Sequence, residues 1–457
     1  MTASLIADSA AALSLETLAE MDTYLDAYAE TGRFSGNVMV SLGCETMFRS
    51  YGLANRGHGI ANAPHTKFRI GSITKQFTAA AILQLQDQGL LSVQAPVATY
   101  LPDYPRGHDI TLHHLLTHSA GIPEYLNGEI FPDIADWLRL SSSLTQVIDR
   151  FKTLPLDFEP GQHFKYSNSG YVLLTHILET VSGQPYTDYV QTHIFSPLGM
   201  VNSGYEVPQA VIPNLAQGYL FIGAETYLQA EPIDMSRPQG AGGLYSTLED
   251  LATWNTWLHS RQSVLTILSE GAVKQLLNPA IAMDLDRDGP DARYGYGLVH
   301  DQAFDRQVIL HSGGIHGFRS TLAHYPKETL SICVLNNFEN TPSEKVAKDL
   351  AAIVFGGAYE LPTEPKRVDV DPTLYEKYIG TYQLLPEMQV EIRVEEGQLV
   401  GQATGQDSFV LSPSSEADFF ATVVDIRITF ELDQAGDTQG FTLKQMGQSL
   451  FAQKLPE

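Results

Sequence analysis

The feature that most constrains the fold of this chain is a change of hydrophobic pattern at residues 360–372. Before this stretch, helix-like and strand-like segments are mixed, whereas after it only the two-residue period of β-strands is present. Three prolines punctuate the polar stretch itself, which predicts a linker. At 457 residues the chain is long enough for more than one domain. We therefore expect a first domain over 1–359, a linker over 360–372 and a second domain over 373–457.

The first part of the chain carries strand-like runs at both of its ends, with helical segments between and after them. Alternating apolar residues predict strands over 36–42, 46–53, 307–311, 319–325 and 330–336. Helical periodicity predicts helices over 15–31, 72–88 and 342–355, and Ser246 with Glu249 predicts a capping box that opens a helix through Trp257. We expect one antiparallel sheet built from both ends of this part and flanked by helices, which is an α+β fold.

The second part of the chain, residues 373–457, is strand-like throughout. Val390, Ile392 and Val394 alternate with charged neighbours, and the run 426–432 repeats this alternation. Turns that contain glycine separate such runs. Several short strands at this spacing predict a small all-β domain, either an up-and-down barrel or a sandwich.

The composition excludes several classes of partner. The chain has 53 acidic against 28 Lys and Arg residues, a formal net charge of −25, which disfavours nucleic acids and anionic lipid surfaces. No apolar run is long enough to span a membrane. The first basic residue is Arg33, so the N-terminus lacks the basic region of a signal peptide, and we expect a cytoplasmic protein, or a periplasmic or secreted one if a signal was removed. Two cysteines, Cys44 and Cys333, make no disulfide framework.

The first candidate for chemistry is the pair Ser72 and Lys75, which is expected at the start of a helix. Positions i and i+3 share a helix face, so the lysine lies beside the serine. A serine hydroxyl needs a neighbouring base to act as a nucleophile, and a desolvated lysine that has lost its proton is such a base. The same pattern also fits an ordinary helix start in which Ser72 caps the helix and Lys75 is solvated.

Two further polar clusters follow. In Tyr166-Ser167-Asn168, a phenol near a cation can carry protons as phenolate, and the amide can hold Lys75 or a substrate carbonyl. In His311-Ser312-Gly313-Gly314, the glycines allow close approach of a substrate, and a backbone N–H can bind an oxyanion. Alone, the first cluster also fits a helix cap and the second a turn at a strand end.

Together these clusters resemble the motifs of the serine β-lactamase and penicillin-binding superfamily, in the branch of class C β-lactamases, esterases and D-aminopeptidases. The resemblance covers about residues 15–357, with supporting stretches at 90–102, 115–123, 240–247 and 294–297. It implies a β-lactamase/transpeptidase-like fold with an acyl-enzyme on Ser72. The implied roles are catalysis by Ser72, Lys75 and Tyr166, substrate binding and orientation by Asn168, His311 and Gly313, and an oxyanion hole from the N–H groups of Ser72 and Gly314.

The C-terminal part resembles the lipocalin-like barrel that follows the catalytic domain in some peptidases of this superfamily, through Tyr378-Ile379-Gly380-Thr381-Tyr382. In such relatives the barrel shapes the entrance of the active site or builds an oligomer. The resemblance therefore implies a homo-oligomer formed through the barrel as one alternative.

One departure from the β-lactamase motifs points to the substrate. His311 stands where lactamases and DD-peptidases have a lysine that attracts a carboxylate, and histidine is mostly neutral at pH 7. We therefore expect a serine hydrolase that cleaves amide or ester bonds of small molecules or short peptides, of D-aminopeptidase or esterase type. The alternatives are a class C-like β-lactamase or DD-carboxypeptidase, and a penicillin-binding-type sensor or scaffold without turnover.

We expect neither a metal nor another cofactor. Residues 284–289 match the opening of a calcium-binding loop, but the twelfth position is Gly295 where such loops have glutamate. His113, His114 and His118 have spacing that would suit zinc, yet local histidine clusters more often cap and pack. These stretches are interpreted as a solvated acidic loop and as packing residues.

Overall fold

The computed structural model describes most of the chain in two compact units. The described residues are 13–207, 209–223, 226–260, 266–283, 292–362, 367–385, 388–406, 408–421, 426–433, 436–445 and 448–456. The first unit comprises Met1–Thr23, Phe34–Tyr219 and Gln229–Glu360, and the second comprises Tyr24–Arg33, Leu220–Leu228 and Leu361–Glu457. Each unit has its own hydrophobic core.

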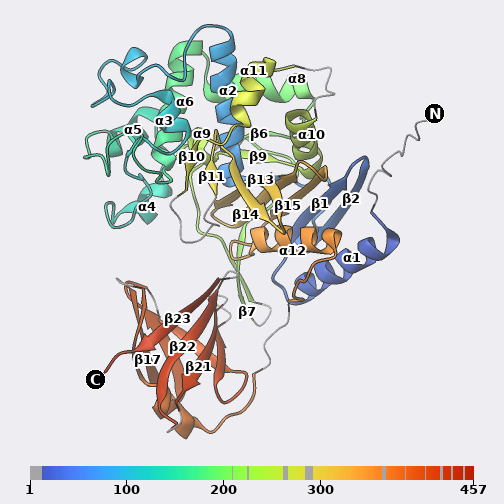
Figure 1. The fold of residues 1–457 in the computed structure, drawn as a ribbon, viewed down its shortest axis with the longest axis vertical. Helices are drawn as coiled ribbons and strands as arrows, with labels where there is room; N and C mark the ends of the chain where they lie inside the picture. The colour runs from blue at the N-terminus through green and yellow to red at the C-terminus, as the bar shows by residue number, and fades with distance from the viewer. Residues whose placement is uncertain are drawn as a thin grey trace, which may run out of the picture. The chain divides into compact units, whose positions relative to one another are not determined.

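The first unit is built around one antiparallel sheet (Figure 1). Its strands run in the order β10 (Ile281–Ala282), β11 (Arg293–Tyr294), β12 (Val299–Ala303), β13 (Arg306–Ile315), β14 (Phe318–Tyr325), β15 (Leu330–Asn336), β1 (Gly36–Leu42) and β2 (Glu45–Tyr51). The N-terminal strand β1 pairs with β15 in the register Gly36↔Asn336 and Val40↔Ile332. The prediction of a single sheet made from both ends of this part of the chain is therefore confirmed.

Helices cover both faces of this sheet. The longer ones are α2 (Thr74–Asp87), α5 (Leu144–Phe151), α6 (Asn168–Ser182), α10 (Leu248–His259) and α12 (Ser343–Phe355), whereas α1 (Leu15–Glu30) is divided between the two units. The shorter ones are α3 (Leu112–Leu116), α4 (Ile134–Leu138), α7 (Tyr186–Val190), α8 (Ser196–Leu198), α9 (Gln239–Gly242) and α11 (Glu270–Leu276). One face carries α12, which packs on β14 and β15, whereas α10 packs on β15 and β1. Helix α2 is buried along almost its whole length and contacts α6 and α9.

The remaining strands and helices before the barrel are short. A small strand pair forms between β3 (Leu53–Asn55) and β4 (Ile60–Ala61). A second pair, β7 (Tyr219–Gly223) with β8 (Thr226–Gln229), belongs largely to the second unit. A three-stranded sheet contains β5 (Phe68–Arg69), β9 (Leu244–Ser246) and β6 (Gly204–Tyr205). Short 3₁₀-helices lie at η1 (Gly71–Ile73) and η2 (Val97–Thr99), and a π-helical turn lies at η3 (Gln191–Phe195).

The predicted capping box at Ser246 is wrong by one residue. Thr247 is the N-cap of α10, and its hydroxyl accepts a hydrogen bond from the Asp250 N–H at 3.3 Å. Ser246 instead ends β9, where it pairs with Phe68, and its hydroxyl is bonded to Ser203 at 2.7 Å. Pairing in the small sheet therefore decides which of two adjacent capping residues takes the N-cap position.

Strand β13 is longer than its apolar run predicts. It continues beyond His311 to Ile315, and Gly313 and Gly314 pair with Ser320 and Arg319 of β14. The glycines therefore do not form a turn at a strand end. They continue the strand because β14 supplies partners for them, which the local sequence does not show.

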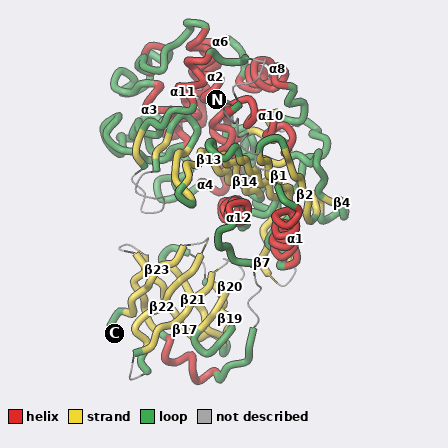
Figure 2. The backbone as a smooth tube through the Cα atoms, turned by 45° about the vertical axis from the view of Figure 1, so that its right-hand side comes forward, coloured by secondary structure: helices red, strands yellow, loops and turns green. Residues whose placement is uncertain are grey.

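The second unit contains a closed eight-stranded barrel (Figure 2). Its strands are β16 (Gly380–Leu385), β17 (Met388–Glu395), β18 (Gln398–Ala403), β19 (Phe409–Pro413), β20 (Asp418–Ala421), β21 (Ile426–Leu432), β22 (Thr438–Gln445) and β23 (Gln448–Lys454). They follow one another in chain order, and β23 pairs with β16 to close the barrel. The up-and-down barrel predicted from the strand pattern is confirmed, and the sandwich alternative is not found.

Aromatic side chains fill the core of this barrel. The Tyr378 ring, from the short helix η4 (Pro372–Tyr378), stacks on Phe430 with centroids 4.1 Å apart. The Phe430 ring in turn packs edge-on against Phe419 and Phe441. Such a core stabilises a barrel of this size through apolar burial.

Candidate active site

Ser72 lies in the helical turn η1, directly before α2. Gly71 has φ +50°, and a Cβ on it would lie 2.8 Å from the Gly314 nitrogen, so glycine is required at this position. Lys75 follows one helical turn later, and its Nζ donates a hydrogen bond to Ser72 Oγ at 3.0 Å. The predicted contact between these two side chains is thus present.

Lys75 is completely buried, and three oxygen atoms surround its amino group. Besides Ser72 Oγ, the Nζ donates to Asn168 Oδ1 and to the Ala241 carbonyl, each at 2.7 Å. Burial lowers the pKa of Lys75 to about 7, and the nearby Glu124 carboxylate partly offsets this effect. A large fraction of the lysine is therefore an unprotonated amine near neutral pH, which is the form that accepts a proton.

Tyr166 completes the group around the serine. Its side chain is hydrogen-bonded to Ser72, and the Lys75 Nζ lies 4.8 Å from the centroid of its ring. Burial raises the pKa of Tyr166 well above its ordinary value, and the hydrogen bond with Ser72 opposes this only in part. The phenol is therefore protonated in the resting site, which differs from the expected phenolate because desolvation outweighs the hydrogen bond with Ser72 and the charge of Glu124 acts in the same direction as desolvation.

Asn168 begins α6 and is held by a residue that the motifs do not identify. Glu124 Oε2 accepts hydrogen bonds from the Asn168 backbone N–H at 2.5 Å and from its Nδ2 at 3.1 Å. These bonds turn Asn168 Oδ1 toward Lys75. Burial raises the pKa of Glu124, while its N–H donors and Lys75 lower it. In the sequence, its position after the 115–123 stretch is the only signal for this carboxyl group.

His311 is buried behind Tyr166. Its Nδ1 is 2.6 Å from the Ser312 carbonyl and its Nε2 is 2.9 Å from the Tyr294 hydroxyl. A carbonyl only accepts, so the proton of the neutral ring is on Nδ1. Burial, and then the charge of Lys75, lower the pKa of His311 to about 3. A neutral His311, as expected from the sequence, is therefore found.

The two glycines of β13 have different surroundings. A Cβ on Gly313 would lie 2.0 Å from the Ile70 carbonyl oxygen, so this residue allows β13 to pack directly against the backbone before η1. Gly314 is exposed and lines a cavity together with Ser72. The backbones of Ser72 and Gly314 thus come together at one site, as the predicted oxyanion hole requires.

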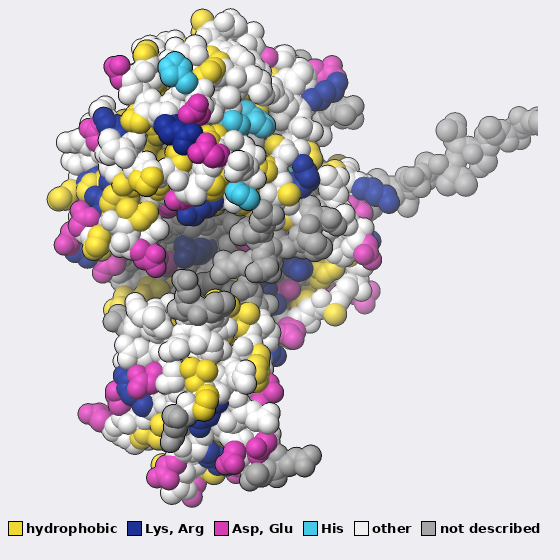
Figure 3. Space-filling view, turned by 60° about the vertical axis from the view of Figure 1, so that its left-hand side comes forward, with side chains coloured by type: hydrophobic (Ala, Val, Ile, Leu, Met, Phe, Trp, Pro, Cys, Tyr) yellow, Lys and Arg dark blue, Asp and Glu magenta, His cyan; other side chains and the backbone are white. Residues whose placement is uncertain are grey.

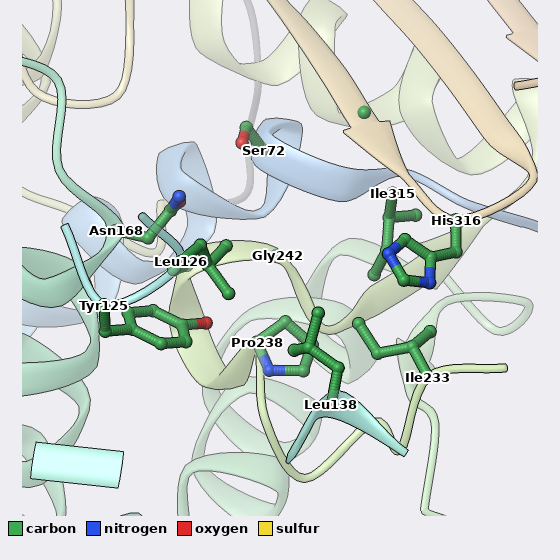
Figure 4. A pocket seen from close by; sticks show the side chains of 12 residues that line it. Ser72, Tyr125, Leu126, Leu138, Asn168, Ile233, Pro238, Gly242, Ile315 and His316 are labelled. Atoms are coloured by element: carbon green, nitrogen blue, oxygen red, sulfur yellow. The ribbon is translucent and has the colours of Figure 1, made fainter. Parts of the chain in front are cut away.

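A cavity of about 140 Å³ opens at Ser72 (Figure 4). Of the predicted site residues, Ser72, Asn168 and Gly314 line it, whereas Lys75, Tyr166, His311 and Gly313 are not among the lining residues. The other lining residues are mostly apolar. Ala241 and Gly242 lie in the supporting stretch 240–247, whereas the remaining ones were not identified from the sequence: Tyr125, Leu126, Leu138, Ile233, Pro238, Ile315 and His316. Most come from loops and short helices, whose sequences show no periodic pattern of apolar residues.

The candidate metal ligands have other roles. His114 closes a capping box with Thr111 at the start of α3, and His113 Nδ1 bonds to the Tyr296 hydroxyl at 2.8 Å. Within the described ranges no cluster of three or more His, Cys, Asp or Glu side chains could hold a metal ion. The acidic loop 284–289 lies outside the described residues.

In the part of the chain that the structure describes, every helix is too short or too polar to cross a bilayer.

Known proteins are similar to this chain in sequence. The family profile described as "Beta-lactamase" matches residues 21–355, and the profile described as "Domain of unknown function (DUF3471)" matches residues 364–455. A penicillin-binding protein of Bacillus subtilis (strain 168) is 28% identical over 436 residues, covering 91% of this chain and 94% of that protein. A D-aminopeptidase of Gluconobacter oxydans (strain 621H) is 29% identical over 75% of this chain and 62% of that protein.

Solved structures agree with the sequence matches. The octameric penicillin-binding protein homologue from Pyrococcus abyssi has a TM-score of 0.65 to this chain at 25% identity. The likeness covers 95% of this chain and 100% of that one. It therefore extends over both compact units.

Proposed function

The chain belongs to the β-lactamase family and is a serine hydrolase, and on that premise we propose that Ser72 is its nucleophile, activated by Lys75 and Tyr166. The observation that carries this proposal is the Ser72–Lys75 hydrogen bond of 3.0 Å in a site whose burial lowers the lysine pKa to about 7. A lysine in solution would be almost fully protonated at neutral pH and could not act as a base.

The proposed reaction has two halves. Unprotonated Lys75 accepts the Ser72 proton as Oγ attacks the carbonyl carbon of an amide or ester. The Ser72 and Gly314 N–H groups bind the oxyanion, a contribution of about 10²–10³ in rate for each donor. Tyr166, bonded to Ser72, passes its phenol proton to the leaving group, and the proton that Lys75 took from Ser72 then restores the phenol. Water then hydrolyses the acyl-enzyme with the same groups as base and acid.

The proposed substrates are small amides or esters with an apolar acyl group, among them derivatives of D-amino acids. The cavity beside Ser72 is lined mostly by apolar side chains such as Leu138, Ile233 and Ile315. A relative of 29% identity is a D-aminopeptidase, which supports this substrate class. Neutral His311 offers no cation for a carboxylate.

Covalent labelling tests the nucleophile. A fluorophosphonate probe, located by mass spectrometry after proteolysis, is expected on Ser72, and Ser72→Ala is expected to lose both labelling and hydrolysis of nitrophenyl esters. Ser343→Ala, which removes a buried hydroxyl at the start of α12 that is bonded to Thr321, is the matched control and should keep both. Labelling at another residue, or full activity of Ser72→Ala, contradicts the assignment.

A substrate panel tests the substrate class. D- and L-amino acid nitroanilides, short-chain nitrophenyl esters and nitrocefin are compared at one pH. We expect turnover of esters and of D-amino acid anilides. Turnover of nitrocefin alone would favour the β-lactamase alternative, and a burst of acylation without turnover would favour a sensor or scaffold.

We also propose that the chain forms a homo-oligomer through its barrel. An octameric homologue aligns over 95% of the chain, and the barrel carries exposed apolar side chains, among them Val394, Val410 and Phe451. Light scattering after size exclusion is expected to give a mass above one chain, and Phe451→Gln to lower it. A monomer at micromolar concentration contradicts this proposal.

The cytoplasmic compartment stays a prediction, which cell fractionation tests.

A further inference from the structure

We propose that His118 is a positioning residue for Tyr166, holding the segment 165–167 so that the phenol stays against Ser72. This inference rests on the proposed function, in which Tyr166 transfers protons. In the sequence, His118 is one of three closely spaced histidines and lies in the supporting stretch 115–123, with no role assigned to it. In the structure its side chain is buried, with 3% of its surface exposed.

The two amide groups that flank Tyr166 both bond to His118. The Lys165 N–H donates to the His118 carbonyl at 2.9 Å, and the Ser167 N–H donates to His118 Nδ1 at 3.2 Å. The imidazole also lies against the phenol ring, with centroids 4.2 Å apart and planes 35° apart. One residue thus fixes the backbone on both sides of Tyr166 and one face of its ring.

The backbone of His118 is in an unusual conformation that makes this arrangement possible. Its φ is +57°, in the left-handed region that residues with a Cβ seldom adopt. The adjoining chain holds this turn, because the Ser119 N–H donates to the His114 carbonyl at 2.9 Å and the Gly161 N–H donates to the Ser119 carbonyl at 2.8 Å. Such conformations persist where the surroundings determine them, often at functional sites.

The hydrogen bonds also define the protonation of the ring. Nδ1 accepts from a backbone N–H, so the proton of the neutral imidazole is on Nε2. Burial first, and then electrostatic repulsion from Lys75 and His311 should they be protonated together with it, lower the pKa of His118 well below its ordinary value. The ring therefore remains an acceptor for Ser167 under conditions in which Lys75 exchanges its proton.

A double-mutant cycle tests the proposal. His118→Ala is expected to lower kcat by about 10- to 100-fold with KM changed less than about twofold, since small displacements of a reacting group cost rates of this order. In the Tyr166→Phe background, the same substitution is expected to lower kcat no further, because His118 acts through the phenol. His118→Asn should keep most of the kcat, since asparagine tolerates positive φ and offers a side-chain acceptor.

The control is His324→Ala, which removes another buried histidine that stacks on a ring and bonds to a serine. It should lower stability without changing kcat. Independent losses from His118→Ala and Tyr166→Phe, or equal kcat for His118→Ala and wild type, overturn the proposal. If the alanine variant does not fold, His118→Phe replaces it, and a wild-type kcat in that variant overturns the proposal. Full activity of Tyr166→Phe would instead contradict the proposed function.

Discussion

At the scale of single residues, the burial of Lys75 makes the proposed activity depend on pH. Because the unprotonated amine is the active form and its pKa is lowered to about 7, kcat/KM for a neutral ester should rise from pH 6 to pH 8 with an apparent pKa near 7. Lys274→Gln, which changes an exposed lysine of α11, should keep this profile. A profile that is flat between pH 6 and 8 would contradict the role of Lys75.

The same burial predicts how stability depends on pH. The unfolded chain holds the Lys75 proton up to its ordinary pKa, whereas the folded chain releases it near pH 7. Between these values the unfolded state binds more protons, so the free energy of unfolding rises with pH, by at most about 1.4 kcal/mol per unit. Urea unfolding at pH 7.5 and pH 9 measures this rise. The Lys75→Met variant should lack it, and an equal rise in both proteins would argue against the lowered pKa.

Single residues also show where sequence reasoning stops. Ser72 and Lys75 are adjacent because of helix geometry alone, which their spacing predicts. The role of Glu124 depends on the N–H groups of Asn168, which lies 44 positions further along the chain. No local pattern encodes that distance, so Glu124 could be found only in the folded chain.

At the scale of elements, the site depends on the direct contact between β13 and the backbone before η1. A Cβ on Gly313 would meet the Ile70 carbonyl at 2.0 Å and Ser320 Oγ at 2.4 Å. We therefore expect Gly313→Ala to lower the free energy of unfolding by about 1–3 kcal/mol and to abolish ester hydrolysis, because β13 must move away from Ser72. Chemical denaturation and a nitrophenyl ester assay measure the two effects.

Gly271→Ala is the matched control for this prediction. Gly271 lies exposed in α11, where a Cβ would meet only Ser269 Oγ at 3.8 Å. Alanine there should leave activity unchanged and stabilise the helix by up to about 1 kcal/mol. Equal activity of Gly313→Ala and Gly271→Ala would show that the close contact at β13 is not needed.

Secondary structure was predictable where a segment is long and periodic. The expected strand 330–336 and helix 15–31 agree with β15 and α1 within one residue. The end of β13 and the N-cap of α10 were wrong because partners in other strands decided them. The short helices and loops around the cavity had no periodic pattern to predict.

At the scale of the whole molecule, the two separate hydrophobic cores predict that the two units unfold independently. If 373–457 forms a domain of its own, as we propose, calorimetry should show two transitions. Phe430→Ala, which removes a central ring of the barrel core, should cost about 3–5 kcal/mol and lower only one of them. Gln398→Ala, at an exposed position of β18, should change neither. One transition that shifts as a whole would contradict separate domains.

Because of the net charge of −25, we expect the salt concentration to change kcat/KM more for a cationic substrate than for a neutral one. Acidic and basic side chains are intermixed on the face in Figure 3, so the effect should come from the summed charge. Raising salt from about 0.05 to 0.5 M should lower kcat/KM by about two- to tenfold for a cationic amino acid anilide. The value for a neutral ester should stay the same. An equal decrease for both would indicate a general effect of salt on the enzyme.

The sequence alone determined the antiparallel sheet, the barrel, the acidity and the contact between Ser72 and Lys75. These follow from backbone periodicity and from charge, which are properties of neighbouring residues. The tertiary structure decided the lowered pKa of Lys75, the protonated Tyr166, the apolar cavity and the contacts of Glu124 and His118. The reason is physical: desolvation and hydrogen bonding depend on atoms that distant segments bring together, and these atoms become neighbours only when the chain folds.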